Sequence, residues 1–191
     1  QANAGDDFIT TGGGSDTIDG GAGHDVLVLS DLADTPGRPT DAFRMEIYMQ
    51  EGSAQSFDGS QVISFINIEE IHTTNLGDRV IGTDDADTMI GGDGNDSIEA
   101  GTGVDFVEGG KGDDHVFGGG GGDQLRGGDG NDMIDAMNGN DYVYGGVGDD
   151  MLIGSGGRDR LRGNKGNDTM EGGRHNDFLQ VFFSVMKYKL S

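Results

Sequence analysis

Aspartates recur every nine residues along most of this chain. From Gly82 to Gln180 the sequence divides into eleven consecutive units of nine residues, and the sixth residue of every unit is an aspartate. These aspartates are Asp87, Asp96, Asp105, Asp114, Asp123, Asp132, Asp141, Asp150, Asp159, Asp168 and Asp177. Carboxylate oxygens are ligands that hard cations such as calcium prefer. A regular row of carboxylates therefore predicts a series of metal sites.

The eighth residue of every unit is apolar. These residues are Met89, Ile98, Val107, Val116, Leu125, Ile134, Val143, Leu152, Leu161, Met170 and Leu179. Each unit thus supplies one carboxylate and one core side chain. A repeat as short as this indicates a solenoid, in which small identical units stack on one another.

The unit Gly91–Glu99 illustrates which elements must position the aspartate. Its first six residues, Gly-Gly-Asp-Gly-Asn-Asp, are typical of a turn, and glycines at offsets one, two and four allow positive φ and expose backbone carbonyls. Its last three residues form a short strand in which Ile98 points inward while Ser97 and Glu99 point outward. Two units make one coil. The predicted fold is therefore all-β, a right-handed parallel β-roll (a β-solenoid) with about 18 residues per coil.

Stacking of the coils predicts the number and kind of the metal sites. Turns about 18 residues apart in the sequence lie about 4.8 Å apart, so each stacked pair offers two aspartates and several carbonyl oxygens to one cavity. Such an all-oxygen site suits Ca²⁺ better than Mg²⁺ or a transition metal. Eleven units give nine pairs, so we expect about nine calcium ions, which would bring the formal charge from −23 to about −5. The glycines expected to contribute at these sites are Gly92, Gly94, Gly110, Gly112, Gly128, Gly130, Gly146 and Gly148.

A shorter block of the same repeat precedes the long one and divides the chain. Three units place Asp7, Asp16 and Asp25 at offset six, and these aspartates are predicted metal ligands as well. Residues 29–72 interrupt the repeat: apolar and polar residues alternate over 43–50, and 62–71 is apolar on both faces. We expect these two strands to form an antiparallel β-hairpin that packs on the roll, with a turn over 52–60. The predicted divisions are therefore 1–28, 29–72, 73–180 for the main roll and 181–191 for a C-terminal cap or tail.

At these residues the chain resembles the repeats-in-toxin (RTX) family of hemolysin-type calcium-binding repeats, whose unit is Gly-Gly-x-Gly-x-Asp-x-apolar-x. Units that begin at Gly91, Gly109, Gly118, Gly127 and Gly145 match this pattern fully. The resemblance implies a calcium-binding β-roll in a protein that a Gram-negative bacterium secretes by a one-step (type I) export system. It also implies a chain that is exported unfolded and folds on meeting extracellular calcium.

Several units depart from the family pattern. Asp85 and His175 replace the glycine at offset four in the first and last units, so we expect weak sites at the two ends. Met137, Ser155 and Asn164 replace the glycine at offset two.

Composition and missing motifs exclude other classes of function. The formal charge of −23 disfavours nucleic acid as a partner, because the surface would repel phosphate. No apolar run is long enough to span a membrane, and the absence of cysteine excludes disulfides and thiolate metal sites. The four histidines form no His-Glu-x-x-His motif, and no Gly-x-Ser-x-Gly motif occurs. We assign no enzyme activity, and we expect the histidines to face solvent.

Outward positions, which the repeat leaves free, carry aromatic and arginine residues on one sheet. They include Phe106, Tyr142, Tyr144, Arg160 and Arg162. These side chains either stiffen the outer face through cation–π pairs or form a docking surface for another domain or subunit. Three functions remain open: a calcium-triggered roll of a secreted protein, a calcium-rigidified adhesin, surface-layer or filament subunit, and the C-terminal module of an exported enzyme or toxin. Because the sequence begins at Gln1, we expect a processed product or a fragment.

Overall fold

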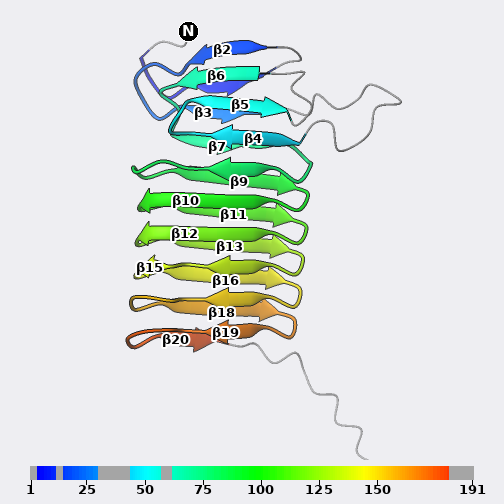
Figure 1. The fold of residues 1–191 in the computed structure, drawn as a ribbon, viewed down its shortest axis with the longest axis vertical. Helices are drawn as coiled ribbons and strands as arrows, with labels where there is room; N and C mark the ends of the chain where they lie inside the picture. The colour runs from blue at the N-terminus through cyan, green and yellow to red at the C-terminus, as the bar shows by residue number, and fades with distance from the viewer. Residues whose placement is uncertain (1–3, 12–14, 30–43, 57–61, 181–191) are drawn as a thin grey trace, which may run out of the picture.

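The protein is a single column of stacked β-coils (Figure 1). The computed structural model describes residues 4–11, 15–29, 44–56 and 62–180. The described residues contain twenty strands and no helix, and so no helix with the length and hydropathy to cross a membrane. An all-β solenoid was predicted from the nine-residue repeat, and the structure confirms it.

Two sheets form the two broad sides of the column. The nine-stranded sheet has the order β1 (Phe8–Thr10), β3 (Val26–Val28), β7 (Glu70–His72), β9 (Thr88–Asp93), β11 (Phe106–Lys111), β13 (Gln124–Asp129), β16 (Tyr142–Val147), β18 (Arg160–Lys165) and β20 (Phe178–Gln180). The eleven-stranded sheet has the order β19 (Thr169–Glu171), β17 (Met151–Ile153), β14 (Met133–Asp135), β12 (His115–Gly121), β10 (Ser97–Gly103), β8 (Arg79–Ile81), β4 (Met45–Tyr48), β5 (Ser53–Ser56), β6 (Val62–Ile66) and β2 (Asp16–Asp19), and β15 (Asn138–Gly139) also pairs with β12. Successive strands of the main roll alternate between the sheets, except that β15 follows β14 in the same sheet.

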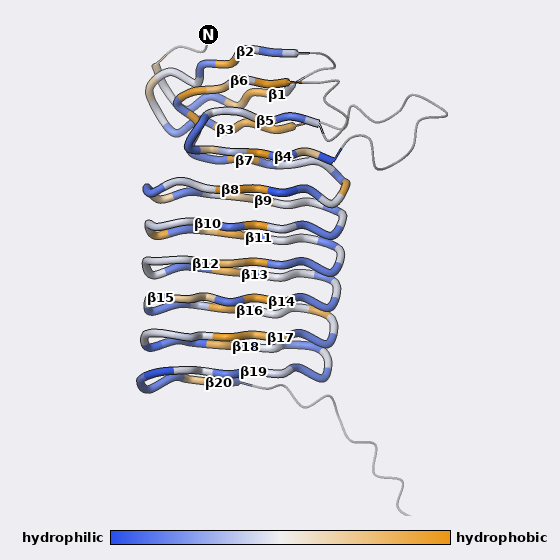
Figure 2. Tube along the Cα trace, in the orientation of Figure 1, coloured by the Kyte–Doolittle hydropathy of each residue, from blue (hydrophilic) through white to orange (hydrophobic). Residues whose placement is uncertain are grey.

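Neighbouring coils of the main roll pair in the predicted register. Ile98 of β10 lies opposite Val116 of β12, and Val107 of β11 lies opposite Leu125 of β13, in parallel pairing. The core is the column of offset-eight side chains between the sheets. In Figure 2, hydrophobic positions recur from coil to coil along the stack. These side chains are fully buried from Met89 to Leu161, whereas Leu179 in the last coil is 43% exposed. Each coil therefore buries its apolar residues against the coils above and below it.

The inserted strands differ from the prediction. β4 and β5 do form an antiparallel hairpin, but β5 occupies residues predicted as a turn, and β5 also pairs antiparallel with β6. These strands extend the eleven-stranded sheet, with β4 beside β8 and β6 beside β2, so they do not pack on a face of the roll. The predicted pairing of 43–50 with 62–71 is therefore wrong. The physical reason is that β5 supplies the antiparallel partner that each of these strands needs.

The predicted strand over residues 62–71 is also divided. β6 ends at Ile66, the chain turns over residues 67–69, and β7 then enters the other sheet. Residues 62–71 were expected to be covered on both faces, but Val62 is 44% exposed and Ile66 is 58% exposed. β6 therefore has one buried and one solvent-facing side. The predicted C-terminal cap at 181–191 lies outside the described residues.

Candidate metal sites

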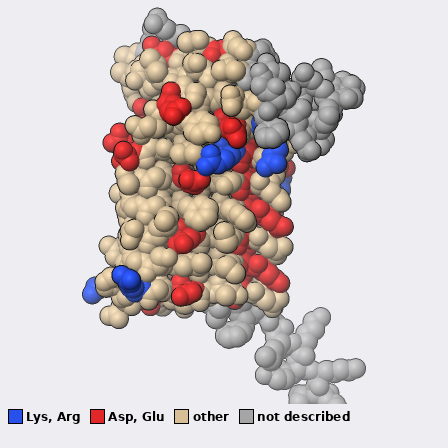
Figure 3. Space-filling model, in the orientation of Figure 1, with Lys and Arg blue, Asp and Glu red and all other residues tan. Residues whose placement is uncertain are grey.

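The aspartates lie in turns along the two narrow edges of the roll. One edge, the regular edge, contains the turns 91–96, 109–114, 127–132, 145–150 and 163–168; the other, the variable edge, contains the turns 82–87, 100–105, 118–123, 136–141, 154–159 and 172–177. In Figure 3 a column of exposed acidic side chains follows the right side of the molecule, where the regular edge lies, whereas the row aspartates from Asp96 to Asp159 are buried. Each edge thus brings one predicted row of ligands together.

One oxygen of most of these aspartates has a fixed structural role. The Oδ1 atom accepts a hydrogen bond from the backbone N–H of the aspartate one coil earlier, as when Asp123 N–H donates to Asp141 Oδ1 at 2.8 Å. Eleven such bonds, of 2.6–3.2 Å, join the aspartates at offset six. These bonds tie neighbouring coils together at their edges. In the folded chain these bonds therefore fix the orientation of the carboxylates that accept them.

The second oxygen of most of these aspartates has no partner. The Oδ2 atom is buried and accepts no hydrogen bond from the described residues at Asp7, Asp25, Asp96, Asp105, Asp114, Asp123, Asp132, Asp141, Asp150 and Asp159. From Asp96 to Asp159 the aspartates are at most 2% exposed. A buried charge without a partner costs several kcal/mol or more. These carboxylates therefore need a positive counterpart.

The electrostatics of the row also favour a bound cation. Burial, together with the nearby carboxylates of Asp114 and Asp78, raises the pKa of Asp96 to about 8, against the opposing effect of the backbone hydrogen bond. The pKa of Asp114 and Asp150 is raised to about 7 for the same reasons. Ionisation of all the stacked carboxylates at once is therefore unfavourable unless a cation lies between them.

Glycine at offset one makes room for the unpartnered oxygen. A Cβ atom at Gly127 would lie 2.2 Å from Asp132 Oδ2, and one at Gly145 would lie 2.2 Å from Asp150 Oδ2. Neither glycine has a positive φ, so these turns do not use the positive φ that glycine at offset one allows. The physical requirement at offset one is space beside the carboxylate.

Glycines at offsets two and four do adopt positive φ. Gly128 and Gly130, for example, have φ of 128° and 144°. A Cβ atom on either would lie within 2.0 Å of a carbonyl oxygen in the stacked turn of the preceding coil. The eight glycines predicted at these positions all share the positive φ, so backbone carbonyls crowd each turn beside the aspartate.

Two turns at the start of the main roll are closed by threonine. Thr83, at offset two, donates to Asp87 Oδ2 from its backbone N–H at 2.6 Å and from its hydroxyl at 2.9 Å. Thr74 donates to Asp78 Oδ2 in the same way, at 2.9 and 2.7 Å. The second oxygen of these two carboxylates is therefore occupied by the protein itself, although Asp87 was predicted to be a metal ligand.

The first block of the repeat is only partly assembled into a row. Asp7 and Asp25 lie in adjacent coils, because β1 pairs with β3 in the same register as the coils of the main roll. Asp16 belongs to β2, whose partner β6 places Ile63 opposite it, so the structure brings no second predicted ligand beside Asp16. Glu69 precedes β7 and receives a hydrogen bond from Asp25 N–H, a role that the repeat pattern could not reveal.

The donor set decides which cation fits. Among the described residues, no cluster of three or more His, Asp or Glu side chains can hold a metal. A site in these turns must therefore combine carboxylates with backbone carbonyls, and every donor is a hard oxygen. This set fits calcium, which accepts six to eight oxygen ligands in flexible geometry, and it lacks the nitrogen and sulfur donors typical of zinc or copper.

The outward face of the nine-stranded sheet carries the predicted cation–π pairs. The guanidinium of Arg126 lies 5.0 Å from the ring centre of Phe106, that of Arg160 lies 5.0 Å from Tyr142, and that of Arg162 lies 5.6 Å from Tyr144. Arg126 also pairs with Glu108 at 3.7 Å. The pairs link strands of neighbouring coils; the three arginines are exposed, whereas Phe106 and Tyr144 are half-buried.

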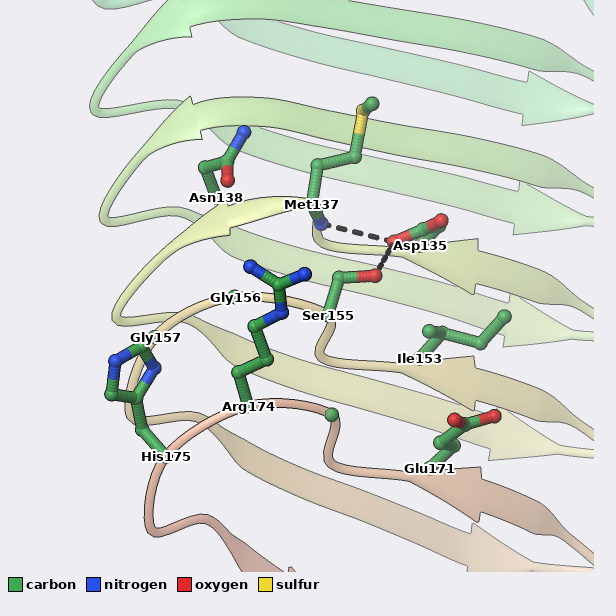
Figure 4. Close-up of a pocket in the computed structure, with 11 residues that line it drawn as sticks. Asp135, Met137, Asn138, Ile153, Ser155, Gly156, Gly157, Glu171, Arg174 and His175 are labelled. Atoms are coloured by element: carbon green, nitrogen blue, oxygen red, sulfur yellow. Dashed lines mark hydrogen bonds between the residues drawn. The ribbon is translucent and has the colours of Figure 1, made fainter.

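A groove opens on the variable edge, where the repeat departs from the family pattern. Its volume is about 840 Å³, and its lining includes Asp135, Ser155, Arg174 and His175 (Figure 4). Asp135 Oδ1 accepts hydrogen bonds from Met137 N–H at 3.0 Å and Ser155 Oγ at 2.8 Å. Met137 and Ser155 have φ of 67° and 65°, so these replacements for glycine keep the left-handed backbone of the turn.

Comparison with known protein families gives the same assignment. The family model described as RTX calcium-binding nonapeptide repeat (4 copies) matches residues 1–35, 72–107, 81–116, 117–152 and 153–180. A search of curated proteins found no match to the chain. The family model spans both blocks of the repeat, and its nine-residue period is the period at which aspartates recur along the sequence. The chain therefore belongs to the RTX calcium-binding nonapeptide repeat family.

Proposed function

We propose that this chain is a calcium-triggered folding module of a secreted protein. We further propose that its calcium sites are the open turns, that is, the turns whose aspartate has a buried Oδ2 atom without a partner. The observation that carries the proposal is the set of ten buried Oδ2 atoms without a partner. Where a turn of another nine-residue unit is stacked on an open turn in the next coil, the Oδ2 atom would bind a cation together with oxygens of that turn. Calcium would thus supply the positive charge that the rows lack.

The proposed sites differ in part from those predicted from the repeat. Eight sites lie in the main roll, beside the open aspartates Asp96, Asp105, Asp114, Asp123, Asp132, Asp141, Asp150 and Asp159. One more lies between Asp7 and Asp25 in the first block. The total of nine agrees with the expected number, but the pair of Asp87 and Asp105 is replaced by the pair of Asp7 and Asp25. Threonine takes the place of the cation at Asp87.

Calcium binding would then control where the protein folds. Without calcium, the buried carboxylates oppose the stacking of the coils on which the core depends. A ligand that binds only the folded state stabilises it by roughly 1.4 kcal/mol per site at ten times its dissociation constant, so nine sites together rival the stability of a whole domain. Calcium is scarce in the cytosol and abundant outside, which supports an extracellular or cell-surface location. The RTX repeat family supports a Gram-negative bacterium as the source.

Circular dichroism during a calcium titration tests the proposed function. In excess chelator we expect a largely disordered chain, and on addition of calcium a cooperative transition to a β-rich spectrum. Magnesium at the same concentration should not produce the transition, because it demands compact octahedral geometry. A β-rich spectrum in excess chelator at neutral pH would show that calcium is not the trigger.

A second function, a docking surface, is favoured by the outward arginines. In a chain with a formal charge of −23, the exposed Arg126, Arg160 and Arg162 gather on one sheet beside a groove of about 430 Å³ that Tyr144 lines. This surface would suit an acidic domain or subunit in an adhesin, surface-layer or filament protein. Replacing Tyr142, Tyr144, Arg160 and Arg162 with Ser or Thr should preserve calcium-dependent folding. Light scattering in calcium should then show loss of any assembly that the unmodified chain forms.

A further inference from the structure

The turn that leaves the inserted strands stands in line with the calcium turns of the variable edge. It contains only Asn67, Ile68 and Glu69, between β6 and β7. β7 pairs with β3 on one side, with Val26 opposite Glu70, and with β9 on the other. Glu69 therefore occupies the place in the row that an aspartate holds elsewhere, between Asp25 and Asp87.

The hydrogen bonds of this turn repeat those of the turns in the nine-residue units. Asp25 N–H donates to Glu69 Oε2 at 2.9 Å, just as Asp7 N–H donates to Asp25 Oδ1 at 2.9 Å. Gly20 N–H donates to the carbonyl of Ile66 at 3.0 Å, which aligns Gly20 with the start of the short turn. The glutamate side chain is one methylene longer than that of aspartate. From a turn of only three residues it still reaches the N–H group of the aspartate one coil earlier.

Two oxygens converge beside this glutamate without a positive partner. Asp25 is fully buried, and its Oδ2 atom accepts no hydrogen bond from the described residues. A Cβ atom at Gly20 would lie 2.7 Å from Asp25 Oδ2 and 2.0 Å from the carbonyl oxygen of Asn67, so both oxygens border the same small space. In the turns of the nine-residue units the same space lies between the Oδ2 atom of an aspartate and a glycine carbonyl. At Gly91, for example, it lies between Asp96 Oδ2 and the carbonyl oxygen of Gly109.

We propose that Asp25, the Asn67 carbonyl and Glu69 form a further calcium site, which the nonapeptide pattern does not contain. The identity of the cation rests on the proposed function above. The site joins the first block of the repeat to the main roll across the insertion. Asn67 supports it with a φ of 56°, a left-handed conformation that asparagine tolerates better than most residues.

The number of bound calcium ions in two neighbouring variants tests this site. Glu69→Gln keeps an acceptor for Asp25 N–H but removes the charge, whereas Glu70→Gln alters the adjacent carboxylate, which pairs with His72 at 2.5 Å. In equilibrium dialysis of the full chain against saturating calcium, with the metal measured by mass spectrometry, we expect Glu69→Gln to bind one ion fewer than the unmodified chain. Glu70→Gln should bind the full number.

The outcomes separate this site from the proposed function. If Glu69→Gln binds as many ions as the unmodified chain, the site does not exist. If the unmodified chain binds no calcium at all, the proposed function itself fails. A crystal structure of the unmodified chain grown in calcium needs no variant to fold: an ion about 2.3–2.6 Å from Asp25 Oδ2 and from Glu69 is the expected result, and a water molecule or empty space there overturns the proposal.

Discussion

The first two turns of the main roll and the turns that follow them solve the same electrostatic problem differently. In the closed turns, Thr74 and Thr83 each give two hydrogen bonds to the second oxygen of a buried aspartate. In the open turns, from residue 91 onward, that oxygen has no partner at Asp96 and at every later row aspartate up to Asp159. The closed turns are complete without a metal, so we infer that they are the part of the roll least dependent on calcium.

The residue at offset two accounts for this difference. Thr83 does not adopt positive φ, because its β-branched side chain disfavours that conformation, and its hydroxyl and N–H turn toward the aspartate. Glycine at the same offset adopts positive φ in the open turns, and so do Met137, Ser155 and Asn164. Loss of glycine alone therefore does not close a turn; a β-branched residue with a hydroxyl does.

Acid should produce the largest change, because it acts on all the open turns together. Burial raises the pKa of their aspartates, to about 8 for Asp96 and about 7 for Asp105 and Asp141. A carboxyl group whose pKa is raised in the folded state contributes its full stabilisation below its unfolded pKa, near 3.8. This contribution is lost as the pH rises through the folded pKa, about 7 to 8. In chelator, circular dichroism should therefore show more β-structure at pH 4 than at pH 8.5. Equal or greater β-structure at pH 8.5 would contradict the raised pKa values.

Filling the space beside one open carboxylate should have the next largest effect. In Gly127→Ala the new Cβ would lie 2.2 Å from Asp132 Oδ2 and 2.6 Å from Asp132 Cγ. We expect the loss of one calcium ion and of about 1–3 kcal/mol of unfolding free energy in calcium, measured by denaturant titration. Gly122→Ala is the matched control, because the nearest atom to its Cβ is Asn140 O at 3.6 Å. Equal losses in the two variants would show that the carboxylate is not the constraint.

Opening a closed turn should have a smaller effect of opposite sign on calcium binding. Thr83→Gly removes the hydroxyl and allows the positive φ of the open turns, so we expect one additional bound calcium ion per chain. Thr83→Val removes the hydroxyl alone and should add no ion, but it should cost about 1–3 kcal/mol of stability, because a buried carboxylate loses a donor. Calcium counting and denaturant titration measure the two effects. An unchanged calcium count in a folded Thr83→Gly would mean that threonine does not exclude the metal.

The smallest effect concerns the outer side of the regular edge. There Asn and Asp alternate at offset five, and Asn131 donates its N–H to Asp113 while accepting from Asp149 N–H. Asn131→Asp would place three carboxylates in adjacent rungs, so we expect a loss of about 0.2–1 kcal/mol at low salt that disappears at high salt. Asn95→Asp, with one acidic neighbour in the ladder, should lose less. A loss that salt leaves unchanged would point to a cause other than charge repulsion.

Much of the fold could be predicted from the sequence, because each nine-residue unit repeats the same physical requirements. The aspartate at offset six and the apolar residue at offset eight were enough to predict the coil length, the core column and the rows of carboxylates. The positive φ of Gly128 and Gly130 also follows from the pattern. These features are local, and a local pattern is visible in a single sequence.

Features that depend on contacts between distant residues could not be predicted. Glu69 replaces an aspartate only because β7 enters the row between β3 and β9, and it lies outside the nine-residue register. The closure of Asp87 by Thr83 depends on the direction of a hydroxyl, which composition does not reveal. The inserted strands extend a sheet that other segments complete, so the alternation over residues 43–50 predicted a strand but not its partner.

Anomalous diffraction from crystals of the full chain grown in calcium tests most directly whether calcium fills the open turns and not the closed ones. We expect an anomalous peak beside Asp123 Oδ2, between the turns 118–123 and 136–141, and corresponding peaks beside the other open aspartates of the main roll. No peak is expected within bonding distance of Asp78 Oδ2 or Asp87 Oδ2, where threonine already donates two hydrogen bonds. Calcium bound to Asp87 Oδ2, or no calcium beside Asp123, would contradict the distinction between open and closed turns.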